Sequence, residues 1–282
     1  MAYQEDGIVR NIGSKDHEKS VVTGYGEVAV QGKRWEMEDA HIIIPAFRGN
    51  SDEFFAGVYD GHAGKIAADF ISLHLHENLS SLLETHTPEE ALREAFLLTD
   101  RQIQEQGITD GATVVTAYLK GSDLYIANAG DARAVLGRRV EYSELLEGLR
   151  LSHDHKADDP DEVTRIESLG GYVTSSYETG IPRVNGRLAI ARAIGDHDGE
   201  LEGYVSAEPY ISKTNLMQND GLLILACDGV WDVISDNEAV QLIRNVNDPQ
   251  LAAETLKDEA LRKESRDNVS AIVINLNASR GV

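Results

Sequence analysis

The sequence has only one cysteine, Cys227, among its 282 residues, so no disulfide can form within the chain. A lone cysteine is typical of proteins that work in a reducing compartment. No apolar run approaches the ~20 residues of a membrane-spanning helix. The polar residues 1–6 are unlike a secretory signal peptide, and Ala2 excludes the N-myristoylation signal. We therefore expect a cytoplasmic protein, with the nucleus as a further compartment, and no membrane partner.

Basic residues are scarce, since 26 lysines and arginines stand against 48 aspartates and glutamates, for a formal net charge of −22. Nucleic acids and anionic membranes are polyanions, so this charge argues against either as the main partner. The sequence also lacks internal repeats, low-complexity tracts and long linkers. We expect residues 1–20 to form a surface segment and residues 21–282 to form a single catalytic domain, which is monomeric.

The motifs of several common enzyme classes are missing. The chain has no Walker A loop, no G-x-G-x-x-G fingerprint, no C-x-x-C pair and no G-x-S-x-G elbow. His153 and His155 flank Asp154, but no ligand-spaced partner completes a histidine metal site. Cys227 lies within an apolar run, which is typical of a small buried hydrophobic residue. No covalent nucleophile is therefore indicated.

Three apolar strand-like runs meet an aspartate. Residues 54–59 lead into Asp60, residues 221–227 lead into Asp228, and Asp267 directly precedes the run 268–274. A turn alone would explain any single Asp-Gly pair. Three carboxylates at strand ends predict a metal site assembled from separate strands, and hard oxygen ligands favour Mg²⁺ or Mn²⁺. After Asp60, Gly61 is expected to adopt an unusual backbone conformation and to allow a close approach to the main chain.

Other polar residues near this pattern have two interpretations each. Beside a metal cluster, Arg34 could hold a phosphoryl group by two parallel hydrogen bonds, and His62 could protonate a leaving oxygen. Without such a cluster, Arg34 would be a surface arginine and His62 a structural or merely exposed histidine. Glu38 and Asp39 could extend the acidic cluster or belong to a charged connector.

The hydrophobic pattern places strands in adjacent runs and helices largely in pairs. Strands are predicted at 21–30, 40–45, 54–60, 112–119, 123–129, 133–137, 222–227 and 268–275, and helices at 64–83, 88–107, 160–169, 235–246 and 248–261. In the first helix Ile66, Phe70 and Leu73 stand at helical spacing, and in the third Leu169 is expected inward. Residues 138–150 are uninformative, and residues 172–186 are predicted to form a surface loop or flap. This order differs from the strict alternation of a parallel α/β sheet. We predict an α+β fold, an antiparallel β-sandwich flanked by α-helices on both outer faces in a four-layer αββα arrangement.

Six segments carry a resemblance to a known family. They are Arg34–Asp39, Asp60–Gly64, Asn128–Arg133, Leu188–Asp196, Asp228–Asp232 and Asp267–Asn268. In this order they resemble the motifs R-x-x-M-E-D, D-G-H-x-G, N-x-G-D-S-R, L-A-V-S-R-A-L-G-D, D-G-x-W-D and D-N of the metal-dependent protein phosphatases of the PP2C type. Ala132 and Ala191 replace the usual serines without replacing a ligand. The resemblance covers about residues 24 to 275.

This resemblance implies hydrolysis of phosphoserine and phosphothreonine in phosphoprotein substrates by a water that bridges two Mg²⁺ or Mn²⁺ ions. It implies that Asp60 bridges the metals and that the Gly61 carbonyl binds one of them. Glu38, Asp228 and Asp267 would complete the cluster directly, and Asp39 would do so through water. Asp131, with Asp228, fits the family's weaker third metal position.

By the same resemblance Arg34 binds the substrate phosphate and His62 is the general acid. Two alternatives remain open from the sequence. One is a pseudophosphatase that keeps the fold without the chemistry, although no ligand is missing. The other is a metal-dependent hydrolase of small phosphoesters.

Overall fold

The computed structural model describes residues 21–143, 145–177 and 179–277. Its strands are β1 (Val22–Val30), β2 (Ala40–Pro45), β3 (Glu53–His62), β4 (Gly111–Lys120), β5 (Asp123–Ala129), β6 (Arg133–Arg139), β7 (Leu146–Arg150), β8 (Val173–Ser175), β9 (Pro182–Val184), β10 (Ile194–Gly195), β11 (Tyr210–Asn215), β12 (Asp220–Ala226) and β13 (Val269–Leu276). Its helices are α1 (Ile66–Leu82), α2 (Pro88–Glu105), α3 (Pro160–Ser168), α4 (Asp228–Trp231), α5 (Asp236–Ile243) and α6 (Pro249–Arg262), with a short 3-10 helix at Phe47–Gly49. The predicted surface segment 1–20 and the end of the predicted domain, 278–282, lie outside the described residues.

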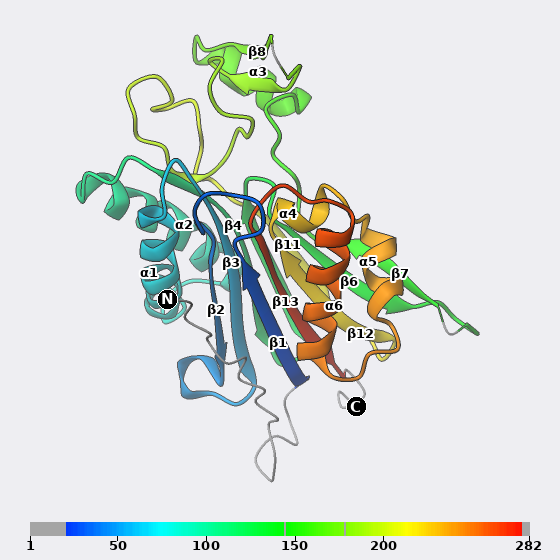
Figure 1. The fold of residues 1–282 in the computed structure, drawn as a ribbon. Helices are drawn as coiled ribbons and strands as arrows, with labels where there is room; N and C mark the ends of the chain where they lie inside the picture. The colour runs from blue at the N-terminus through cyan, green and yellow to red at the C-terminus, as the bar shows by residue number, and fades with distance from the viewer. Residues whose placement is uncertain (1–20, 144, 178, 278–282) are drawn as a thin grey trace, which may run out of the picture.

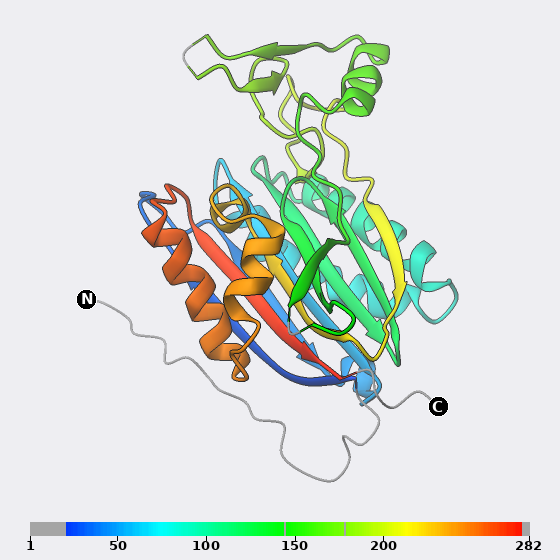
Figure 2. The same ribbon diagram turned by 90° about the vertical axis from the view of Figure 1, so that its right-hand side faces the viewer.

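Two antiparallel sheets pack face to face. One has the order β1-β13-β12-β6-β7, and the other has the order β11-β5-β4-β3-β2, with β10 paired to β4. Figures 1 and 2 show α1 and α2 on the outer face of the second sheet and α5 and α6 on the outer face of the first. The predicted four-layer αββα arrangement is confirmed.

Alternation along the central strands explains these layers. In β3, Phe54 and Val58 pack between the sheets, whereas Phe55 and Tyr59 pack against the helical layer of α1 and α2. Strand β12 divides its side chains in the same way between the inner core and the layer of α5 and α6. Successive strand residues point to opposite faces, and both faces are covered. Continuous apolar runs are therefore the expected sequence of these strands.

The two helices on the second sheet were both predicted, but they differ in which of their apolar residues are buried. In α2, Thr87 and Glu90 form a reciprocal capping box, and Leu92, Phe96 and Ile103 are buried as expected. In α1, by contrast, Ile66 and Leu73 are 64% and 61% exposed. The buried stripe of α1 contains Ala67, Ala68, Ile71, Leu75 and Leu79. Small alanines at the start of α1 let the helix approach the sheet closely, which turns the bulkier residues outward.

A smaller lobe, residues 157–177 and 179–205, stands above one end of the sandwich (Figures 1 and 2). It contains α3 and the hairpin of β8 and β9, so the predicted flap at 172–186 is a short two-stranded element. Its own core includes Ala157, Ile166 and Leu201. Leu169 is exposed, so its predicted inward position is wrong. We refer to this unit as the upper lobe.

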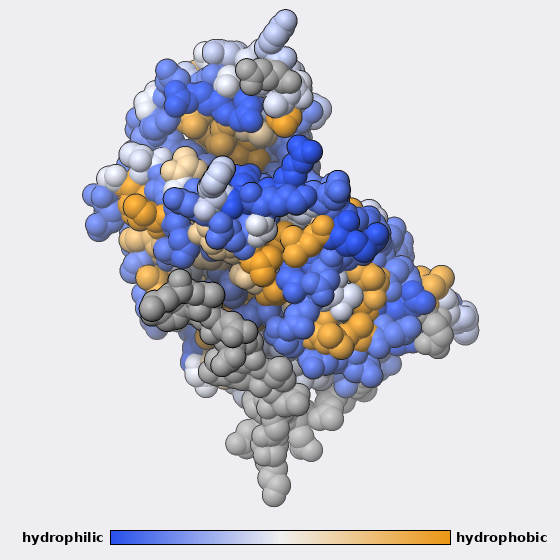
Figure 3. Space-filling view, in the orientation of Figure 1, coloured by the Kyte–Doolittle hydropathy of each residue, from blue (hydrophilic) through white to orange (hydrophobic). Residues whose placement is uncertain are grey.

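The surface is predominantly hydrophilic on the face shown in Figure 3, with apolar side chains gathered beneath the upper lobe. Within the described ranges, no helix is long and apolar enough to cross a membrane. The strands β7 and β11 and the short helix α4 were not predicted.

Candidate active site

The ends of several strands bring carboxylates together below the upper lobe. Asp60 lies near the end of β3, Asp131 in the turn between β5 and β6, and Asp228 at the start of α4 after β12. Carboxylate oxygens of these three residues lie within 4.8 Å of one another. Asp60 also forms a second such group with Asp39 and the Cys227 sulfur. Asp60 is thus common to both groups.

The electrostatics of this cluster indicate a place for cations. Burial raises the pKa of Asp60 well above its ordinary value, and Asp228, Asp39 and Asp131 raise it further. Burial, followed by Asp131 and Asp267, also raises the pKa of Asp228 well above the usual range. Buried like charges are costly unless an opposite charge offsets them. Hard divalent cations would supply that charge through the ligand type they prefer.

Asp39 provides an independent test of fit. Its Oδ2 accepts a 2.6 Å hydrogen bond from the Ser270 hydroxyl. Its Oδ1 is buried and has no hydrogen-bond partner in the described part of the chain. Buried polar atoms are normally satisfied, so Asp39 Oδ1 is available to a water or an ion. The donor set therefore fits Mg²⁺ or Mn²⁺.

Cys227 does not compete for this role. It is fully buried, and burial followed by Asp39 and Asp60 raises the pKa of its thiol well above the ordinary value. The Ser270 amide donates to its sulfur at 3.2 Å. A neutral thiol is a poor ligand for hard cations and a poor nucleophile. The predicted structural role of Cys227 agrees with this environment.

The backbone at Gly61 lies so close to the backbone of Glu38 that only glycine fits there. A Cβ at Gly61 would lie 2.4 Å from the carbonyl oxygen of Glu38. Its φ is not in the positive region, so the predicted unusual conformation is wrong. The Glu38 amide in turn donates to Asn268 Oδ1 at 2.9 Å, and Asn268 Nδ2 donates to the carbonyls of Gln31 and Glu36. Asn268, for which no separate role was predicted, therefore fastens the connector 31–39 to the acidic cluster.

Arg34 and Asp267 form one edge of the site. The Arg34 guanidinium donates to Asp267 Oδ2 at 2.5 Å and remains half exposed. Burial alone would lower the pKa of Arg34, but Asp267 raises it on balance. Asp267 belongs to neither of the two sets of three clustered residues described above. It does line a cavity of about 240 Å³ together with Asp228. Arg34 thus presents a positive charge beside the cluster.

His62 follows Asp60 by two residues on β3 and is oriented by a residue that sequence reasoning missed. Its Nε2 is 2.8 Å from both carboxylate oxygens of Asp196. Burial alone would lower the pKa of His62, but the hydrogen bond and charge of Asp196 raise it on balance. Asp196 ends the segment Leu188–Asp196, which was noted only for its resemblance. The pair favours a protonated imidazole that can donate.

Asp131 has an ion-pair partner, Lys156, that was not predicted from the sequence. Lys156 Nζ lies 2.5 Å from Asp131 Oδ2. Burial would lower the pKa of Lys156, but Asp131, Asp232 and Asp228 raise it well above its ordinary value. A protein ammonium thus offsets part of the negative charge at the position expected for a third, weaker metal.

Comparison with known proteins gives a consistent result. The family model described as "Protein phosphatase 2C" matches residues 23–269. The chain is 42% identical over 227 residues to "Probable protein phosphatase 2C 14" of Arabidopsis thaliana, covering 79% of this chain and 49% of that protein. It is 38% identical over 265 residues to "Protein phosphatase 2C homolog 1" of Schizosaccharomyces pombe, covering 89% and 72%. The chain thus spans about half of the first relative and nearly three quarters of the second.

Solved structures agree on the fold. "Crystal structure of serine-threonine phosphatase 2C from Toxoplasma gondii" matches with a TM-score of 0.81 at 23% identity, covering 96% of this chain and 99% of that one. "Structure of a C.elegans sex determining protein" matches with a TM-score of 0.80 at 25% identity, covering 90% and 64%.

Proposed function

This chain belongs to the protein phosphatase 2C family of metal-dependent protein serine/threonine phosphatases, and we propose that it hydrolyses phosphoserine and phosphothreonine in proteins. The observation that carries the proposal is the convergence of Asp60, Asp131 and Asp228 within 4.8 Å, from segments far apart in the sequence. Phosphoprotein substrates are the partners that this function requires. The single buried cysteine supports a cytoplasmic location, and we expect a monomer.

Two Mg²⁺ or Mn²⁺ ions would be held by Asp60, as the residue common to both, and by the Gly61 carbonyl. Glu38, Asp228 and Asp267 would complete the site directly, and Asp39 would do so through water. The free Asp39 Oδ1 and the raised pKa values of Asp60 and Asp228 support this assignment. When bound, the two cations supply an attacking water activated at neutral pH and neutralise charge on the phosphoryl oxygens. Asp131 with Asp228 would form the weaker third position, which Lys156 also borders.

The protein's own side chains then account for binding and proton transfer. Arg34 is half exposed and anchored by Asp267, so its remaining N–H groups can hold the substrate phosphate. His62 donates a proton to the departing serine or threonine oxygen, and Asp196 holds the imidazole in place and in its charged form. No covalent nucleophile is needed for this scheme.

The experiment is phosphopeptide hydrolysis with Mn²⁺, with Mg²⁺ and with EDTA, for the wild type and Asp60→Asn. Asp69→Asn, at an exposed ion pair on α1, is the matched control. We expect metal-dependent turnover in the wild type and the control, and near-complete loss in Asp60→Asn. Turnover that resists EDTA contradicts the proposal. A strong preference for a nucleotide or sugar phosphate over the phosphopeptide would instead favour a small-phosphoester hydrolase.

A further inference from the structure

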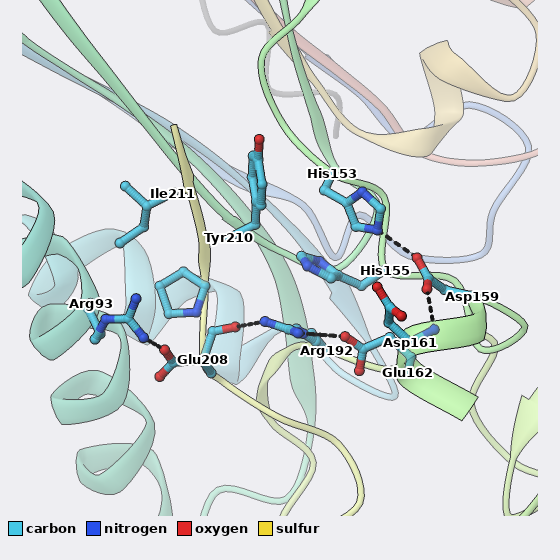
Figure 4. Close-up of a pocket in the computed structure, with 11 residues that line it drawn as sticks. Arg93, His153, His155, Asp159, Asp161, Glu162, Arg192, Glu208, Tyr210 and Ile211 are labelled. Atoms are coloured by element: carbon cyan, nitrogen blue, oxygen red, sulfur yellow. Dashed lines mark hydrogen bonds and ion pairs between the residues drawn. The ribbon is translucent and has the colours of Figure 1, made fainter. Parts of the chain in front are cut away.

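A second pocket, separate from the acidic cluster, opens between the base of the upper lobe and the edge strand β11. Its volume is about 570 Å³, within the range of ordinary ligand sites. Figure 4 shows its walls, with Tyr210 and Ile211 on β11, Arg93 on α2, and His153 and His155 on the opposite side. No residue to which we assign the phosphatase reaction lines it.

The pocket and the candidate active site share one wall. The Gly130 amide donates to His155 Nδ1 at 3.2 Å, and the His155 amide donates to the Gly130 carbonyl at 3.0 Å. The next residue, Lys156, turns to Asp131 on the other side. The segment 153–156 therefore separates the pocket from the carboxylate cluster by a single layer of chain. A molecule bound in the pocket would lie directly behind Asp131.

His155 offers a buried donor to this pocket. It is 2% exposed. His155 Nδ1 lies 3.2 Å from the Gly130 amide and 3.1 Å from the Gly130 carbonyl. That carbonyl already accepts hydrogen bonds from the His155 amide and the Asn128 side chain, so we assign Nδ1 as the acceptor of the Gly130 amide. This assignment places the ring proton on Nε2. Among the described residues no group pairs with Nε2, and Figure 4 shows the ring reaching toward the cavity.

The same ring is uncharged near neutral pH, because burial and then the neighbouring Arg192 lower the pKa of His155 to about 4. The imidazole is thus a neutral N–H donor. It suits a neutral acceptor such as a peptide carbonyl oxygen.

The charged side chains of the pocket leave an excess of negative charge. Arg93 pairs with Glu208, and Arg192 pairs with Glu162, which Arg165 outside the pocket also contacts. Asp159 binds His153. The carboxylate of Asp161 has no side-chain partner in the part of the chain that the structure describes, and this exposed residue lines the pocket (Figure 4). The pocket therefore attracts a cation.

Flat rings form the adjoining wall. The ring centroids of His153 and Tyr210 are 5.9 Å apart at an interplanar angle of 44°, and Tyr210 is 41% exposed. A guanidinium can stack on such faces while pairing with a carboxylate, which a compact ammonium does less well.

We propose that this pocket binds an arginine side chain of the phosphoprotein substrate, with Asp161 pairing the guanidinium and His155 Nε2 donating to a neighbouring peptide carbonyl. The inference rests on the proposed phosphatase function and names a feature that its substrates carry. The bound arginine would lie close behind the catalytic cluster and would hold the phosphorylated residue near Arg34 and His62.

The first test uses paired phosphopeptides that differ only in an arginine replaced by glutamine, in a series with increasing spacing between arginine and phosphoserine. Asp161→Asn is compared with Glu167→Gln, an exposed acidic position at the other end of α3 that does not line the pocket. At the optimal spacing we expect the wild type and Glu167→Gln to show a KM about threefold or more lower for the arginine peptide. Asp161→Asn should lose this difference. Hydrolysis of p-nitrophenyl phosphate should be equal in all three proteins.

A second measurement separates this inference from the phosphatase proposal. The unphosphorylated arginine peptide is titrated into the wild type and Asp161→Asn while the imidazole signals of His153 and His155 are followed by NMR. Saturable shifts in the wild type that weaken in Asp161→Asn support the pocket even if no phosphoester is hydrolysed, which would count against the phosphatase function alone. Equal KM values for both peptides at every spacing, together with no shifts, would overturn the arginine site and leave the phosphatase proposal standing.

Discussion

The buried imidazole of His155 predicts a loss of stability in acid that a single substitution removes. Its folded pKa is about 4, against ~6.5 for an exposed histidine. Between these two pH values the imidazole is protonated in the unfolded chain but neutral in the folded protein. Stability therefore falls as the pH falls from ~6.5 toward ~4. At pH ~5 the linkage amounts to about 2 kcal/mol of unfolding free energy relative to neutral pH.

The assay is urea unfolding near pH 7.5 and near pH 5 in the same buffer and metal concentration, for the wild type and His155→Gln. Glu162 and Asp236 are paired with arginines, whose contacts lower the pKa values of both carboxyl groups more than burial raises them. The stability that these ion pairs give the protein is also lost in acid. That loss is common to both proteins, so the difference between their slopes isolates His155. We expect His155→Gln to lose about 2 kcal/mol less than the wild type on acidification, and the exposed control His86→Gln to behave as the wild type. Identical losses in His155→Gln and the wild type would refute the reasoning.

Three further outcomes follow from the packing. Gly61→Ala should weaken Mn²⁺ affinity in calorimetric titration, because its Cβ would collide with backbone 2.4 Å away; unchanged affinity would count against the close-approach argument. Phe96→Ala should cost about 3–5 kcal/mol in urea unfolding, whereas Leu73→Ala, exposed on α1, should cost under about 0.5 kcal/mol; similar costs would show that the helical layer is misassigned. Asp196→Asn should lower kcat far more than it changes KM, since Asp196 is buried and contacts His62, which it orients; an effect confined to KM would speak against that role.

The central strands and the acidic ends could be predicted because their physical signals are local. The run 54–59 alternates between two buried faces, so it is apolar throughout, and the aspartate that follows it lies two residues before the end of β3. Thr87 and Glu90 mark the start of α2 through a capping box that is complete within four residues. Such features need no knowledge of distant contacts.

The features that escaped prediction depend on distant contacts or on weak patterns. Strand β11 is half exposed and polar, because it is an edge strand held by its backbone pairing to β5. The contacts of Asp196 with His62 and of Lys156 with Asp131 join residues 134 and 25 positions apart, and no spacing rule encodes them. The buried stripe of α1 uses small alanines in place of the bulkier Ile66, and the helical spacing of Ile66, Phe70 and Leu73 did not reveal it.

The most direct test of the account is calorimetric titration of Mn²⁺ into the wild type, Asp60→Asn and Asp228→Asn, with Asp69→Asn as control and circular dichroism to verify the fold. Because the carboxylates of Asp60 and Asp228 converge in one buried cluster, the account predicts that the wild type and Asp69→Asn bind Mn²⁺. It also predicts that Asp60→Asn and Asp228→Asn stay folded and lose most of the binding. Absence of binding in the wild type, or undiminished binding in folded Asp60→Asn, would contradict the claim that these aspartates hold the cations.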